Sequence, residues 1–164
     1  MPVAARVIVF VGLSAGVVAA QPTQPIYLQY DGFVRNADAS LTLAFGYYNL
    51  NQVDVTIEAG DDNRFVGGAA DRGQPTVFLA GRHRFTCVMV VRRDADAELR
   101  WQVQFAGRTS VTTDRVLDPR YALEAASAER VVAGLDGMTQ PPGVCLERAP
   151  TVEAGGTGLP ARAR

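Results

Sequence analysis

Apolar and polar residues alternate along most of the chain from about Ile26 to Val111. A period of two is typical of β-strands that turn one face to a core and the other to solvent. The alternation is cleanest in residues 99–105, where the apolar positions are Leu99, Trp101, Val103 and Phe105. A tight turn at 106–108 and a returning strand at 109–113, with Val111 inward, predict a hairpin here.

Residues 74–91 form the stretch around which the predicted fold is built. They fit a hairpin of two strands joined by a turn at Ala80-Gly81. The second strand is apolar on both faces, with Phe85, Cys87, Met89 and Val91 on one side and Val88 and Val90 on the other. Because strands covered on both faces lie inside a sheet, we expect a central strand here.

Other short alternating segments predict further strands between turn residues. They cover 26–30 with an extension past a bulge to 35, then 41–47, 53–57 with Val53, Val55 and Ile57 inward, and 64–66. Roughly seven or eight strands at nearly even spacing are typical of a β-sandwich or barrel. The sequence therefore predicts an all-β protein with a single immunoglobulin-like antiparallel β-sandwich.

The pattern changes after Asp118-Pro119. The Ala-rich stretch that follows fits a short helix with Tyr121, Ala125, Ala128, Val132 and Leu135 on one side, although its first residues also fit a continuing strand. Residues 151–164 are rich in Gly, Ala, Pro and Arg, which predicts disorder. We expect a sandwich domain at 21–118 and an irregular, partly disordered C-terminal extension at 119–164.

The N-terminus has the features of a secretory signal peptide. Arg6 supplies a positive charge, an apolar run extends from Val7 to Val18, and the small residues that follow predict cleavage after Ala20. The run is too short to span a bilayer comfortably; an uncleaved anchor or a buried strand is the alternative. We expect residues 1–20 to be removed, the protein to be secreted or periplasmic, and the mature chain to lack a membrane span.

The two cysteines, Cys87 and Cys145, are candidates for a disulfide because exported chains commonly pair their cysteines. Closing a loop of this length contributes about 4 kcal/mol in the chain-entropy model. Two separate free thiols are the alternative. A reactive thiol is not expected, since Cys87 lacks the basic or helix-terminal surroundings that activate one.

Charge and composition argue against several classes of function. The net charge is −1, whereas nucleic-acid-binding proteins normally carry a basic patch or stripe. All 16 positive charges are Arg, so the Lys that a phosphate-binding P-loop requires is missing. We therefore expect neither a nucleic-acid partner nor a cofactor.

Catalytic and metal-binding patterns are also sparse. The single histidine, His83, has no nucleophile-elbow motif to serve, and zinc needs three or four ligands that the chain does not supply together. The loop residues Asp61, Asp62 and Asn63 offer the oxygen ligands that Ca²⁺ prefers, but they are also ordinary turn residues. We expect no metal site and no enzymatic activity.

Tyr47 and Tyr48 are the candidate ligand-binding residues. Exposed aromatic rings on a sandwich can stack on sugars or anchor a protein partner. Tyr48 is the better placed for exposure, since its parity is opposite to that of the apolar positions from Leu41 to Tyr47. The alternative is that these tyrosines, with Tyr27 and Tyr30, pack in the core and across strands.

Several segments resemble a group of uncharacterised exported bacterial proteins with small β-sandwich folds. The segments are Phe45-Gly46-Tyr47-Tyr48-Asn49, Asp62-Asn63-Arg64-Phe65, Asp71-Arg72-Gly73-Gln74-Pro75-Thr76, Phe78-Leu79, Leu99 and Trp101. The resemblance implies a fold and export but no activity. The function expected from the sequence is an exported, non-enzymatic module that binds a protein or a cell-surface glycan; a carbohydrate-binding module and a small secreted hydrolase are the alternatives.

Overall fold

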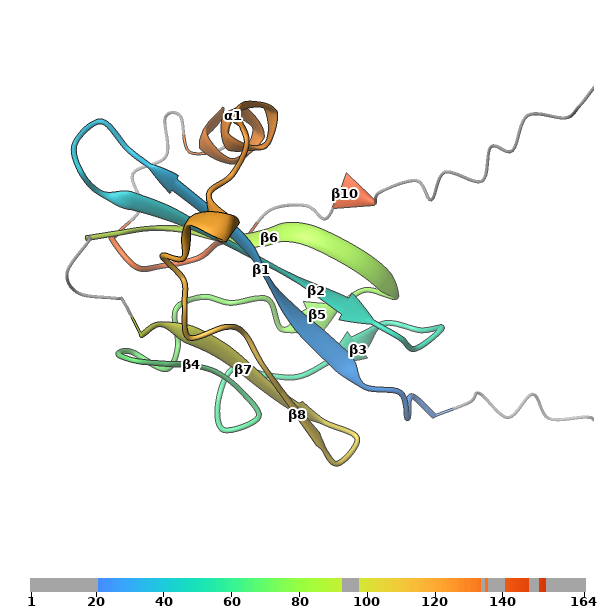
Figure 1. Ribbon diagram of the computed structural model, residues 1–164. Helices are drawn as coiled ribbons and strands as arrows, with labels where there is room; N and C mark the ends of the chain where they lie inside the picture. The colour runs from blue at the N-terminus through green and yellow to red at the C-terminus, as the bar shows by residue number, and fades with distance from the viewer. Residues whose placement is uncertain (1–20, 93–97, 134, 136–140, 148–150, 153–164) are drawn as a thin grey trace, which may run out of the picture.

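The computed structural model describes residues 21–92, 98–133, 135, 141–147 and 151–152 (Figure 1). The predicted signal peptide at 1–20 and most of the predicted disordered tail lie outside these residues. In the described part of the chain, no helix combines the length and the apolar character needed to cross a bilayer.

Strands dominate the described residues. Their bounds, in chain order, are β1 (Ile26–Arg35), β2 (Leu41–Asn49), β3 (Val55–Thr56), β4 (Asn63–Val66), β5 (Val77–Phe78), β6 (Gly81–Val91), β7 (Arg100–Phe105), β8 (Arg108–Val111), a 3-10 helix η1 (Pro119–Tyr121), α1 (Ala125–Ala133), β9 (Leu146–Glu147) and β10 (Thr151–Val152). The prediction of a mainly β protein is confirmed.

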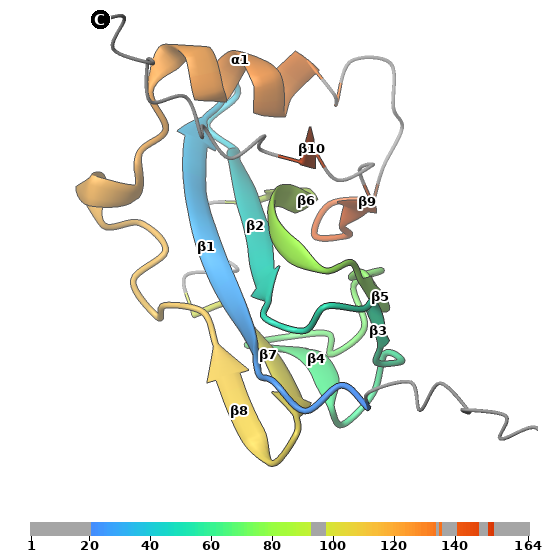
Figure 2. The same cartoon turned by 90° about the vertical axis from the view of Figure 1, so that its right-hand side faces the viewer.

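The strands form three antiparallel sheets among the described residues. The largest runs in the order β1-β2-β6-β10, with β9 also paired to β6. The second has the order β4-β7-β8, which includes the predicted hairpin, and the third is the short pair β3-β5. The two smaller sheets lie on one side of the large sheet, and α1 lies on the other (Figures 1 and 2).

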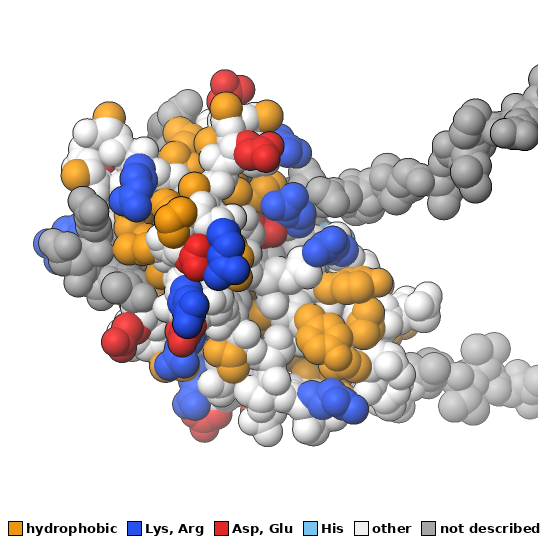
Figure 3. All heavy atoms as spheres, in the orientation of Figure 1, with side chains coloured by type: hydrophobic (Ala, Val, Ile, Leu, Met, Phe, Trp, Pro, Cys, Tyr) orange, Lys and Arg blue, Asp and Glu red, His pale blue; other side chains and the backbone are white. Residues whose placement is uncertain are grey.

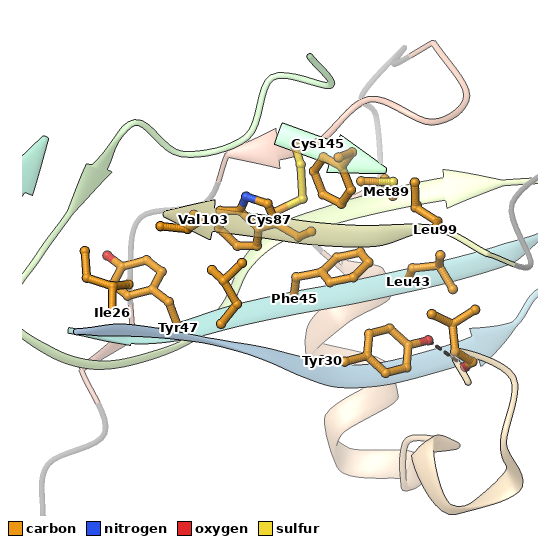
Figure 4. Packing of buried hydrophobic residues seen from close by; sticks show 14 of the residues in the cluster. Ile26, Tyr30, Leu43, Phe45, Tyr47, Cys87, Met89, Leu99, Val103 and Cys145 are labelled. Atoms are coloured by element: carbon orange, nitrogen blue, oxygen red, sulfur yellow. Dashed lines mark hydrogen bonds between the residues drawn. A yellow bond between two sulfur atoms is a disulfide. The ribbon is translucent and has the colours of Figure 1, made fainter. Parts of the chain in front are cut away.

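The main core lies between the large sheet and the two smaller ones. Phe45 and Tyr47 point into it from β2, and Leu99 and Val103 approach from the opposite layer (Figure 4). Trp101 is fully buried and stacks between Phe65 and Phe78, with ring centroids 5.9 Å from each. The predicted inward face of residues 99–105 is thus confirmed, although Phe105 is only partly buried at the rim.

The predicted hairpin between β5 and β6 is wrong. β5 pairs with β3, whereas β6 pairs with β2 in the large sheet. The turn at Ala80-Gly81 therefore carries the chain from one sheet to the other, and Gly81 with φ 94° allows the change of direction. The prediction of β6 as a central strand is confirmed, because it lies between β2 and the short strands β9 and β10.

Phe85 points to the face opposite the predicted one. The register between β2 and β6 shifts here: the step from His83 to Cys87 on β6 covers four residues, whereas the paired step from Tyr47 to Phe45 on β2 covers two. The extra residues form a bulge, and Phe85 within it has φ 57°. The bulge turns Phe85 to the outer face, where it packs with Ala44, Val88 and Val131. Cys87, Met89 and Val91 keep the predicted inward direction.

Two further inward positions were predicted wrongly. Val53 is 46% exposed because β3 begins only at Val55, and Val111 is 43% exposed at the end of the edge strand β8. A helix does form after the sandwich strands, but it buries Val131 rather than Val132. Leu135, which belongs to the predicted side, packs against the same cluster as Val131.

The predicted disulfide is present between Cys87 and Cys145, whose Cα atoms lie 4.9 Å apart. Both cysteines are buried in the core (Figure 4). The backbone N–H of Cys145 donates to the carbonyl of Arg72 at 2.6 Å, and Arg72 Nη1 donates to the carbonyl of Gly143 at 3.0 Å. The segment before β9 is therefore tied to β6 by a covalent bond and to the loop between β4 and β5 by hydrogen bonds.

Candidate binding face

Three large side chains form one row across the outer face of the large sheet. Tyr27 of β1 is paired with Tyr48 of β2, which in turn is paired with Arg82 of β6. Tyr27 is 47% exposed and Tyr48 is 40% exposed. Figure 3 shows hydrophobic side chains gathered over the ends of β1 and β2 with basic side chains beside them. This row is here called the Tyr–Arg row.

Strand alternation places the row on the surface. Ile26 and Leu28 point into the core, so Tyr27 between them must point outward. In the same way, Tyr48 must point outward because its neighbour Tyr47 points into the core. The two rings are therefore exposed aromatic surface.

The structure separates the two predicted ligand-binding tyrosines. Tyr47 is 2% exposed, its ring packs against Phe78 with centroids 4.9 Å apart, and its hydroxyl accepts the N–H of Leu79 at 3.0 Å. Tyr47 is thus part of the core. Tyr48 lies on the surface, and its aromatic neighbour there is Tyr27, whose outward parity is visible in the sequence.

Next to the row, a buried aspartate joins two strands. Asp31 sits at a register shift in β1, and its Oδ2 accepts the N–H of Phe85 at 2.7 Å. Its Oδ1 accepts Arg84 Nε at 3.0 Å. The carboxylate therefore satisfies a backbone N–H of the bulge in β6, and the predicted bulge in β1 is what brings it there.

Gly46 of β2 makes this junction possible. A Cβ on residue 46 would lie 2.6 Å from Asp31 Oδ2 and 2.9 Å from the Cα of Arg84, and it would also collide with the carbonyl of His83. Any side chain there would push Asp31 away from β6. The glycine in the middle of a strand thus marks a close approach of neighbouring groups.

The environment of Asp31 raises the pKa of its carboxyl group above the ordinary value. Burial is the main cause, since it disfavours the charged form; the hydrogen bonds from Phe85 and Arg84 act in the opposite direction. Only 4% of the Asp31 side chain is exposed, against 30% of Arg84. The aspartate is therefore held in place by the fold, while its arginine partner reaches toward solvent.

An open hollow of about 370 Å³ lies beside the Tyr–Arg row. It is lined by Gln29, Tyr30, Asp31, Arg82 and Arg84. Gln29 Oε1 accepts Arg82 Nε at 3.1 Å, which holds the arginine at the edge of the hollow. The volume falls in the range of roughly 300–1,000 Å³ that is usual for small-ligand sites.

The predicted calcium residues do not form a common site. Asp61 and Asp62 are exposed, whereas Asn63 is fully buried. The amide of Asn63 donates to the carbonyls of Ile57 and Pro75, both at 2.9 Å, and its Oδ1 accepts Trp101 Nε1 at 2.9 Å. Across the described residues, no group of three or more His, Cys, Asp or Glu side chains is arranged to hold a metal ion.

His83 lies in the core rather than in a cleft. It is 2% exposed, its Nε2 is 3.0 Å from the carbonyl of Ala80, and its ring packs against Tyr47 with centroids 5.2 Å apart. A base in this position is out of reach of a substrate on the surface.

Comparisons with protein-family models, with curated proteins and with solved structures found no match to the chain. The arrangement of side chains on the outer face therefore carries the functional argument by itself.

Proposed function

We propose that this chain is an exported, non-enzymatic binding module with an immunoglobulin-like sandwich fold. In this proposal residues 1–20 are a signal peptide removed after Ala20, and the chain is a member of the exported bacterial group that its sequence resembles. The module binds a component of the cell surface through the Tyr–Arg row. The row contains Tyr48, which the sequence pattern singles out, and adds Tyr27 and Arg82.

The support for a binding role is the exposure of two tyrosine rings at directly paired positions. Residues paired across antiparallel strands have Cβ atoms about 4.5–5.5 Å apart, so the two side chains start side by side on the same face of the sheet. Tyr and Arg are the residue types most enriched at binding hot spots, since they offer large contact area at low entropic cost.

The proposal is tested by retention of the processed protein on an isolated cell-envelope fraction that contains membrane, wall polymer and surface protein. We expect wild type to be retained and a Tyr27→Ala/Tyr48→Ala variant to lose at least about tenfold in affinity, a loss of about 1.4 kcal/mol. Val77→Ala is the matched control, because Val77 is 46% exposed but lies on β5. Equal retention of all three proteins would contradict the proposal.

A further inference from the structure

We infer that the ligand of the Tyr–Arg row is a polysaccharide whose sugars carry carboxylate groups. The inference rests on the proposed binding function and names its ligand class. Two observations carry it: an arginine with free donors stands at the end of an aromatic platform, and a polar hollow opens beside it.

Arg82 is positioned to receive an anion. Its Nε is occupied by Gln29 Oε1 at 3.1 Å, and within the described residues this is its one protein hydrogen bond. The two terminal nitrogens of the guanidinium group therefore still have N–H donors to offer. A carboxylate is the anion that fits such a planar fork in a bidentate manner.

The charge next to Arg82 is already balanced. The Asp31 carboxylate lies 3.0 Å from Arg84 Nε, so these two groups form their own ion pair. The hollow thus retains the positive charge of Arg82. A ligand with a negative charge at this edge gains an attraction that a neutral ligand does not.

The rest of the surface suits a sugar ring better than a peptide. The faces of Tyr27 and Tyr48 can cover the C–H face of a sugar, whose apolar and polar sides match an aromatic platform with a polar edge. The side-chain amide nitrogen of Gln29, which lines the hollow, can donate to hydroxyl groups at the sugar rim. A hollow with this polar lining offers no pocket for the apolar anchor of a typical protein partner.

The experiment measures binding of wild type to polygalacturonate and to alginate by isothermal titration at 0.15 M salt. The controls are the same polymers after chemical reduction of their carboxyl groups, and poly-glutamate of equal charge per length. We expect binding to at least one polyuronate and at least tenfold weaker binding to its reduced form. Poly-glutamate should bind no better than the reduced polymer.

Substitutions then separate the charge from the platform. Arg82→Gln should lower polyuronate affinity at least tenfold, and Tyr48→Ala should do the same. Arg115→Gln removes the same charge from an exposed position in the loop after β8 and should leave the affinity unchanged. Thermal unfolding of each variant shows whether the fold is intact.

Three results would overturn the inference. They are no binding to either polyuronate, equal binding to the reduced polymers, and equal binding to poly-glutamate. If the envelope fraction still retains the protein in a manner that depends on Tyr27 and Tyr48, the binding function stands and only the ligand class is wrong. If retention does not depend on these tyrosines, the binding function itself has failed.

Discussion

The two faces of the large sheet use polar residues in opposite ways. On the inner face and the layer opposite, buried polar side chains are bonded to the backbone: Asn49 Nδ2 donates to the carbonyls of Val53 and Phe78, and Thr112 Oγ1 accepts the N–H of Trp101. On the outer face, Tyr27, Tyr48 and Arg82 keep polar or aromatic surface toward solvent. The inner polar groups hold the fold, as the buried Asp31 does on the outer face, whereas Tyr27, Tyr48 and Arg82 are exposed to the proposed ligand.

The same difference explains three polar residues in the segments 45–49, 62–65 and 71–76. Asn49, Asn63 and Gln74 all lie in those segments, and all are buried with side-chain hydrogen bonds to the backbone. A polar residue in such a segment invites a functional interpretation. Here it satisfies backbone groups at places where strands end and the sheets meet.

The largest effect is expected from Asn63→Ala. This substitution leaves the carbonyls of Ile57 and Pro75 and the indole N–H of Trp101 without a partner in the core. At about 1–3 kcal/mol for each unsatisfied group, we expect the free energy of unfolding to fall by about 5 kcal/mol. Chemical denaturation followed by Trp101 fluorescence measures it.

The neighbour of Asn63 provides the control. Asp62 is exposed, so Asp62→Ala should change stability by less than about 0.5 kcal/mol. Similar losses in the two variants would show that the loop, rather than the buried amide, sets the stability of this layer. A rise in melting temperature with Ca²⁺ that Asp62→Ala abolishes would instead restore the loop as a cation site.

A second, smaller effect compares two adjacent tyrosines on opposite faces. Tyr47→Ala removes a fully packed ring and should cost about 4 kcal/mol. Tyr48→Ala removes a ring that is 40% exposed and should cost less than about 1 kcal/mol, mainly from its pairing with Tyr27. Denaturation curves of the two variants, measured in parallel, give both losses in unfolding free energy. Comparable losses would mean that Tyr48 supports the fold rather than a binding surface.

The mainly β fold and most strand positions could be predicted from the sequence because alternation depends on local burial. Residues 99–105 show this well, since Leu99, Trp101 and Val103 all point inward as expected. Strand pairing could not be predicted in the same way. The turn at Ala80-Gly81 looks like a hairpin turn, yet only the packing of two sheets decides that β5 and β6 separate there.

The candidate site was predictable in part. The alternation of inward and outward residues along β2 correctly predicts that Tyr48 is exposed. The same kind of alternation fails at Phe85 on β6, because a bulge inserts residues there that no local pattern reveals. The junction of Asp31, Gly46 and Arg84 joins three strands distant in sequence, so its members could not be recognised together. The position of Arg82 beside Tyr48 likewise could not be predicted, because it depends on the pairing of β6 with β2.

The smallest expected effect is a pH dependence with opposite signs at two aspartates. Burial raises the pKa of Asp31, so the folded state binds its proton more tightly than the unfolded chain does. Stability contributed by this group is therefore present at low pH and falls as the pH rises above the ordinary value for Asp. Asp118 is the reverse case: hydrogen bonds from Arg120 lower its pKa to about 2, so its contribution is lost as the pH falls from about 4 toward 2.

Melting temperatures of wild type, Asp31→Asn and Asp118→Asn between pH 2 and pH 8 test this contrast. Relative to Asp31→Asn, wild type should gain stability as the pH falls from 7 toward 4, because burying a charged Asp31 becomes unnecessary. The stability that wild type has in excess of Asp118→Asn should shrink as the pH falls below about 4. The double variant should show neither trend. A difference curve for Asp31→Asn that stays flat with pH would mean that Asp31 is solvated like a surface carboxylate, and its buried junction with Phe85 and Arg84 would then not exist in solution.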